Sequence, residues 1–146
     1  MNMEIYTLPY FEQRITSVAA GIRKIRFRFE RLDYHKSCMG ADSLALLGPY
    51  GGKWEELMDS CDAFRDQYQV PFDKIERSYR ELQACYRMLE RHTDDDGVEL
   101  RLLMDEYIDT LMTLEEQVMI ELDERTNHIR EGMRALTHMC DTDDGM

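Results

Sequence analysis

The sequence lacks the features that mark membrane-spanning and exported proteins. No stretch approaches the roughly 18 consecutive apolar residues that a transmembrane helix needs. The first residues, 1–6, have neither the basic region nor the apolar stretch of a signal peptide. We therefore expect a soluble, cytoplasmic protein with no membrane partner.

Cysteine is sparse and widely spaced. The four cysteines are Cys38, Cys61, Cys85 and Cys140, and none forms the C-x-x-C spacing of a zinc knuckle or a redox pair. The sequence therefore predicts reduced thiols, no metal site and no cofactor.

Proline and, in the last third, basic residues are also scarce. Only three prolines occur in 146 residues, which suits long helices because proline interrupts them. Residues 1–92 carry 14 acidic and 14 basic side chains, whereas residues 93–146 carry 16 acidic and four basic ones. The net charge of −12 therefore arises from the last third. Such a balance argues against general binding to a nucleic-acid backbone, which requires many Lys and Arg side chains.

The apolar residues recur at the spacing of helices. In the first third their steps alternate between three and four over Phe11, Ile15, Val18, Ile22, Ile25, Phe29 and Leu32. This heptad pattern predicts a helix over residues 8–36, and Thr7 before Leu8-Pro9 is a plausible start.

A second apolar pattern predicts a helix over residues 53–91. It comprises Trp54, Leu57, Cys61, Phe64, Tyr68, Phe72, Ile75, Tyr79, Leu82, Tyr86 and Leu89. Pro71 falls within this pattern, so two interpretations stay open: one helix kinked at the proline, or two helices that meet there. The unbroken pattern favours one continuous helix.

A third pattern predicts a helix over residues 97–140, followed by a disordered acidic tail over 141–146. Asp96 and Glu99 have the spacing of a capping box at its start. The pattern comprises Leu100, Met104, Tyr107, Leu111, Leu114, Val118, Leu122, Ile129, Met133, Leu136 and Cys140.

The predicted fold is a single all-α domain, an elongated antiparallel bundle of three long helices, or four if Pro71 breaks the second. At about 1.5 Å per residue the helices would span roughly 42, 58 and 65 Å. The first is too short to cover the other two, so we expect the protein to associate with another protein or with a second copy of itself.

Two surfaces are candidates for binding a partner. The first helix places two aromatic side chains opposite its apolar seam, with cations beside them: Phe27, Tyr34, Arg23, Lys24 and Arg31. These cations could instead face the acidic last helix. That last helix carries Met104, Met112, Met119 and Met133, whose flexible side chains serve either as ordinary core or as an adaptable groove.

Catalytic motifs are few. No cysteine or serine lies in an activating motif, and Glu124 with His128 has no matching pair on another helix that would complete a di-iron site. Arg87 and His92 resemble the Arg-x4-His motif of HEPN-type ribonucleases, which are small, helical and usually dimeric. The resemblance covers residues 87–92, and Met88 stands where the family usually has a polar residue. It would imply that Arg87 and His92 act together on RNA.

We expect a non-enzymatic protein–protein interaction module, a small acidic helical adaptor, chaperone or assembly factor that uses helix-in-groove contacts. In size, charge and helicity it is similar to the small acidic chaperones of flagellar and type III secretion systems. Three alternatives stay open: an acidic mimic of nucleic acid that inhibits a basic protein, the HEPN-like ribonuclease, and a structural subunit of a larger assembly.

Overall fold

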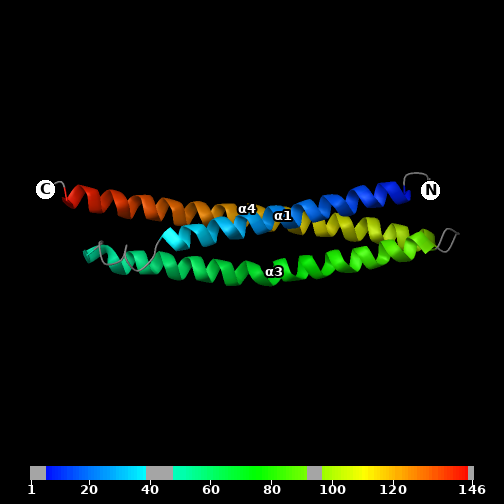
Figure 1. Cartoon of the computed structure of the whole chain (residues 1–146), viewed down its shortest axis with the longest axis horizontal. Helices are drawn as coiled ribbons and strands as arrows, with labels where there is room; N and C mark the ends of the chain where they lie inside the picture. The colour runs from blue at the N-terminus through cyan, green and yellow to red at the C-terminus, as the bar shows by residue number, and fades with distance from the viewer. Residues whose placement is uncertain (1–5, 39–47, 92–96, 145–146) are drawn as a thin grey trace. The chain divides into compact units, whose positions relative to one another are not determined.

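The computed structural model describes residues 6–38, 48–91 and 97–144, with side chains as far as Met139 in the last range. The elements are the helix α1 (Leu8–Cys38), the short 3-10 helix η2 (Gly48–Tyr50), and the helices α3 (Gly51–Arg91) and α4 (Gly97–Asp144) (Figure 1). No strand occurs in these ranges. The all-α fold built from three long helices is therefore confirmed.

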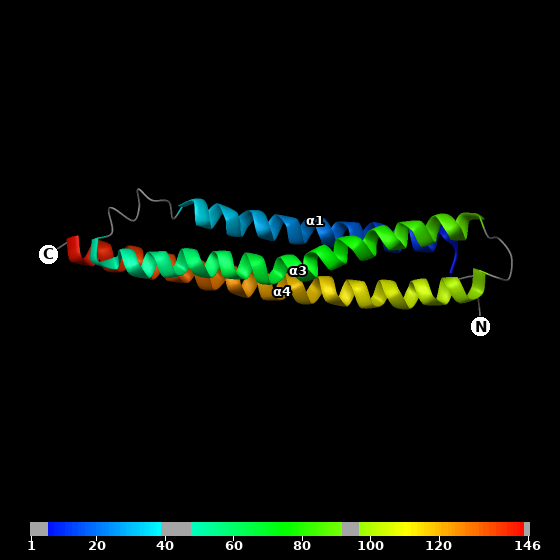
Figure 2. The same ribbon diagram turned by 90° about the horizontal axis from the view of Figure 1, so that it is seen from below.

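The chain divides into two compact units, and each contains a segment of every long helix. Unit 1 comprises Met1–Ile25 and Pro71–Val118, and unit 2 comprises Arg26–Val70 and Met119–Met146. Within each unit the three segments lie side by side, and α3 runs antiparallel to α1 and α4 (Figures 1 and 2). Each long helix is continuous across the division. The single domain that the sequence indicated stays a prediction.

The helix boundaries agree closely with the predicted ones. Thr7 begins α1 as expected: its hydroxyl accepts a hydrogen bond from the Tyr10 amide at 3.2 Å, the geometry of an N-cap. The structure favours the single-helix interpretation at Pro71, since α3 continues through it. Asp96 of the predicted capping box lies outside the described residues.

One boundary differs. The sequence predicted an end at 140 and a disordered tail, whereas α4 continues through Asp144. Extending an existing helix by one more turn costs far less than nucleating a new one, so acidic residues can prolong it. The last two residues, 145–146, lie outside the described part.

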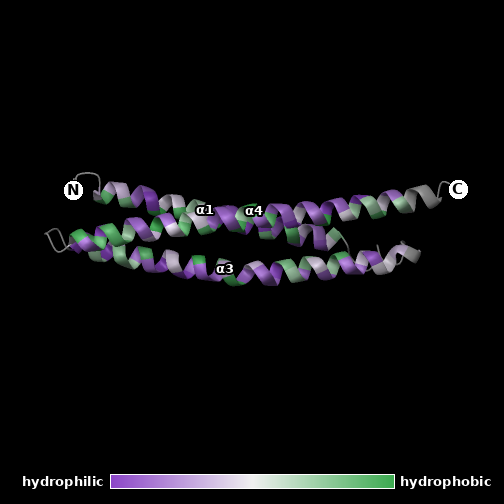
Figure 3. Cartoon of the chain, turned by 180° about the vertical axis from the view of Figure 1, so that it is seen from behind, coloured by the Kyte–Doolittle hydropathy of each residue, from purple (hydrophilic) through white to green (hydrophobic). Residues whose placement is uncertain are grey.

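The predicted seam of α1 is the core face of that helix. All seven of its apolar residues, from Phe11 to Leu32, are at most 8% exposed. Figure 3 shows the corresponding alternation of apolar and polar residues along each helix. In unit 2 the buried cluster comprises Leu32, Trp54, Cys61, Ile129 and Leu136.

The seam of α4 differs from the prediction at three places. Tyr107 is 39% exposed, and its neighbour Ile108 is fully buried instead. Two polar residues, Glu115 and Thr126, occupy core positions with 3% and 4% exposure. The Thr126 hydroxyl is accommodated because it donates to the Leu122 carbonyl at 2.7 Å.

Candidate functional site

Several large apolar side chains are exposed on α3 and α4 in unit 1, and we call them together the α3–α4 strip. Its members are Met88, Leu103 and Tyr107, which are 52%, 63% and 39% exposed, together with the half-buried Cys85. Large apolar side chains gathered on one surface are more informative than single exposed ones.

A hydrogen bond fixes the register of the two helices at this strip. The Tyr107 hydroxyl donates to Glu81 Oε2 at 3.1 Å, which joins α4 to α3. Cys85 and Met88 follow Glu81 by four and seven residues, so they lie on the same face of α3. Leu103 precedes Tyr107 by four residues on α4. The antiparallel register therefore places Cys85 and Met88 of α3 near the level of Leu103 on α4.

Charged residues of opposite sign flank the strip. The exposed Arg77 lies one turn before Glu81 on the same face of α3. On α4 the exposed Glu99 and Glu106 lie close to the face that carries Leu103. The strip is thus apolar along its length, with a cation on one helix and carboxylates on the other.

The predicted aromatic face of α1 is exposed in unit 2. Phe27 and Tyr34 are 58% and 67% exposed, and Arg31 between them is also exposed. The Tyr34 ring lies 5.9 Å from the ring of His35. The other two cations predicted here, Arg23 and Lys24, are exposed residues of α1 in unit 1.

Other cations of α1 do face the acidic helix, which was the alternative interpretation. In unit 1 the Arg14 guanidinium donates to Asp105 at 3.3 Å and to Asp109 at 2.5 Å. In unit 2 Arg28 pairs with Asp123 at 3.0 Å. Several carboxylates of α4 are therefore already matched within the chain, which leaves fewer of them for a basic partner.

The methionines of α4 do not form one groove. Met104 is 2% exposed and belongs to the core, so its prediction as a partner contact is wrong. Met112 is half-buried, and its sulfur accepts a hydrogen bond from the Arg14 guanidinium at 3.9 Å. Met119 and Met133 are half-buried residues of unit 2, and Met133 packs against the buried cluster there. Met104 shares the heptad position of the buried Leu111 and Val118, whereas Met112, Met119 and Met133 share a different position and are only half-buried.

Glu115 is the most perturbed ionisable group that the sequence did not reveal. Burial raises the pKa of its carboxyl to about 8, and the nearby charge of Lys24 only partly opposes that shift. Its Oε2 atom is buried and has no hydrogen-bond partner among the residues that the structure describes. The carboxyl packs on Gly21 of α1, where a Cβ would collide with it. The spacing in the sequence could have revealed its burial, because Glu115 follows Ile108 by seven residues and Leu111 by four, which places it on the same core face.

The described residues assemble no catalytic or metal centre that matches the sequence hypotheses. Arg87 is an exposed residue of α3, and His92 lies outside the described residues. The structure therefore does not test whether the two side chains of the ribonuclease hypothesis lie close together. In the described ranges no group of three His, Cys, Asp or Glu side chains could hold a metal ion. Among the same residues, no helix is long and apolar enough to cross a membrane.

Comparison with known proteins leaves the chain without a family. No protein-family model matches it, and neither a curated protein nor a solved structure matches it significantly.

Proposed function

We propose that the chain is a non-enzymatic protein–protein interaction module, a small acidic adaptor or assembly factor. It binds a helix, from another protein or from a second copy of itself, along the α3–α4 strip of unit 1. The observation that carries the proposal is the exposure of Met88 on α3 and of Leu103 and Tyr107 on α4, two helices that the Tyr107–Glu81 hydrogen bond joins.

The shape and chemistry of the strip suit an amphipathic helix. A helix that docks between two others presents anchors at i, i+3 or i+4, and i+7, and these match a groove lined by apolar side chains of both neighbours. Each large apolar side chain that such a helix covers contributes about 1.5–3 kcal/mol when fully buried. Tyr107 adds a polar end whose bond to Glu81 keeps the ring in place.

The flanking charges give the partner an orientation. A carboxylate on the docked helix is favoured beside Arg77, and a cation is favoured beside Glu99 or Glu106. Exposed pairs of this kind add little affinity but suppress the opposite orientation. The preferred partner is therefore an amphipathic helix whose two polar flanks carry opposite charges.

Leu103→Asp tests the proposal because it places a charge in the middle of the strip. The matched control is Val70→Asp, since Val70 is 72% exposed on α3 in unit 2. Tagged wild type and both variants are used in pull-downs from the native source and in light scattering of the pure protein.

A protein recovered in stoichiometric amount, or a dimer, that survives Val70→Asp and is lost with Leu103→Asp would support the proposal. Recovery that is equal for all three proteins would exclude this strip. A wild type that stays monomeric and recovers nothing would contradict the function itself.

A further inference from the structure

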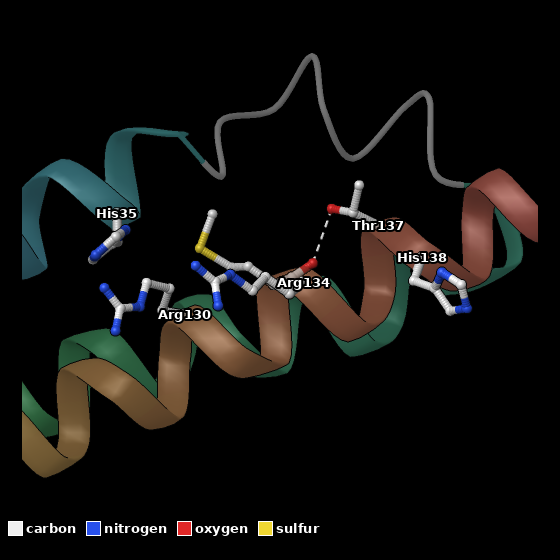
Figure 4. Close-up of a pocket in the computed structure, with 6 residues that line it drawn as sticks. His35, Arg130, Arg134, Thr137 and His138 are labelled. Carbon is white, nitrogen blue, oxygen red and sulfur yellow. Dashed lines mark hydrogen bonds between the residues drawn. The ribbon is translucent and has the colours of Figure 1, made fainter.

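A pocket of about 430 Å³ lies in unit 2 between the end of α1 and the last part of α4. α1 contributes His35, three residues before its end at Cys38, and α4 contributes the other lining residues. These are Arg130, Met133, Arg134, Thr137 and His138. Figure 4 shows the side chains of His35 and Arg130 pointing toward each other from α1 and α4.

The lining of this pocket is cationic in a strongly acidic chain. Arg130 and Arg134 are two of the four basic residues in 93–146, and the six lining residues include no carboxylate. The pKa of His35 is lowered chiefly by burial and then by the charges of Arg31 and Arg130, so cations converge on this imidazole.

The two arginines are not engaged by acidic residues of the described ranges. Arg130 donates to the side-chain oxygen of Asn127 at 2.9 Å, and no ion pair joins Arg130 or Arg134 to a carboxylate there. The Nε atom of Arg130 is buried and has no hydrogen-bond partner within the described part of the chain. By contrast, Arg14, Arg28 and Arg65 each pair with an aspartate. Within the described residues, carboxylates thus neutralise these three arginines but do not neutralise Arg130 or Arg134.

The spacing of the arginines selects the geometry of that anion. Residues four apart on a helix have Cβ atoms about 5–6 Å from each other, so both guanidinium groups can converge on one small group. Each guanidinium donates a planar fork of N–H groups that matches the oxygens of phosphate or carboxylate. Two forks and an imidazole need more acceptor oxygens than one carboxylate offers, whereas a phosphate group offers three.

We propose that the pocket between His35 and the Arg130–Arg134 pair binds a phosphate group carried by a small molecule. Arg130 and Arg134 bind the phosphate oxygens, and the imidazole of His35 closes the site from α1. Met133 forms the apolar wall beside them. The Thr137 hydroxyl donates its proton to the Met133 carbonyl at 2.9 Å, so it has no proton left to donate to an anion. Thr137 therefore forms part of the wall and does not bind the phosphate.

A titration followed by ¹H–¹⁵N correlation spectra tests the proposal with inorganic phosphate as the probe. It is run at constant ionic strength and about pH 7.5, where a phosphate with its second pKa near 6 or 7 is mostly a dianion. We expect saturable shifts confined to the amides around residue 35 and residues 130–138. Shifts that spread over all helices without saturation would reflect charge screening and would overturn the site.

Variants and a second anion make the test specific. Arg130→Gln with Arg134→Gln is expected to weaken binding by about tenfold or more, since charge-assisted hydrogen bonds are lost. Arg125→Gln is the matched control, because Arg125 is an exposed arginine of the same helix that stacks on Phe64 at 5.3 Å and lies outside the pocket. Equal weakening by both would overturn the assignment, as would tighter binding of succinate than of phosphate.

A parallel titration with glycerol phosphate distinguishes a phosphate ester from free phosphate as the ligand. Affinity at least equal to that of inorganic phosphate would identify a phosphomonoester as the ligand class. Loss of binding with the ester would overturn the proposal of a phosphate carried by a small molecule and would leave free phosphate alone as the ligand. Thermal melts of each variant confirm that a lost signal does not reflect unfolding.

Discussion

The buried carboxyl of Glu115 predicts an unusual dependence of stability on pH. The pKa of this group is about 8 in the folded chain, against an ordinary value of 4.5. The folded state therefore binds the proton more tightly than the unfolded state does. The sign follows directly: the free energy of unfolding falls as pH rises from the ordinary value towards the folded one, and it levels off above about pH 8.

The magnitude follows from the shift. One pKa unit corresponds to about 1.4 kcal/mol, so the Glu115 contribution should fall by about 2–3 kcal/mol between pH 5 and pH 7. Lys24 is the charged group that acts on this carboxyl from α1, and its attraction is already included in the shifted value. Glu115→Gln retains the shape and removes the titration, so the variant should lack this part of the pH dependence.

The assay is urea unfolding followed by circular dichroism at about pH 5, 6, 7 and 8, for the wild type, Glu115→Gln and Glu116→Gln. Glu116 is the exposed neighbour of Glu115 on α4, so its variant should follow the wild-type profile. Other titrating groups cancel in the difference between wild type and variant. Parallel profiles for all three proteins would refute the argument, because they would show that the Glu115 carboxyl is ionised and solvated in the folded state.

Four further predictions concern the packing. Gly21→Ala should lower the free energy of unfolding by about 1–3 kcal/mol through overpacking against the Glu115 carboxyl, and Glu115→Ala should relieve much of that loss in a double-mutant cycle by urea unfolding. Ile22→Asp should unfold the protein in a thermal melt, because the residue is 4% exposed and an unpaired buried charge costs several kcal/mol, whereas Phe27→Ser should change the melting temperature little at 58% exposure. Thr7→Ala should cost about 1 kcal/mol in urea unfolding through loss of the N-cap bond, and Thr7→Ser should retain most of it. Cys38 should react with a thiol reagent in the native protein while Cys61 should not, because Cys61 is 1% exposed and burial raises the pKa of its thiol to about 11. A native-state reaction at Cys61 as fast as at Cys38 would contradict the packing of unit 2.

Much of the fold could be predicted from periodicity because the apolar residues of α1 and α3 follow the heptad with few exceptions. Every residue assigned to the α1 seam is buried, and in α3 the steps of three and four continue past Pro71. A proline removes one hydrogen bond but does not change which face of a helix is apolar, so the pattern indicated continuity better than the proline indicated a break.

The predictions for α4 were less accurate because its core is not purely apolar. Glu115 and Thr126 fill core positions, which a search for apolar residues skips. The steps from Ile108 to Leu111, Glu115, Val118 and Leu122 are three, four, three and four. The position of a residue in the heptad therefore predicted its burial more reliably than its polarity did. The same rule places Met104 in the core and Leu103 outside it.

The candidate sites depended on tertiary register, which a single sequence does not supply. The aromatic face of α1 was predictable because its residues share one helix. The α3–α4 strip was not, since only the Tyr107–Glu81 hydrogen bond shows how Met88 on one helix aligns with Leu103 on the other. The cationic pocket likewise joins His35 to residues almost a hundred positions later.

The distribution of charge connects these features. The excess of carboxylates in α4 is partly matched within the chain, since Arg14 and Arg28 of α1 pair with Asp105, Asp109 and Asp123. α1 ends at Cys38, and near that end α4 presents Arg130 and Arg134. A purely acidic helix that imitates nucleic acid would gain nothing from two arginines that no carboxylate of the described residues neutralises. Their position near the end of α1 is explained if the last part of α4 binds an anion, and the apolar strip of unit 1 then serves a separate protein contact.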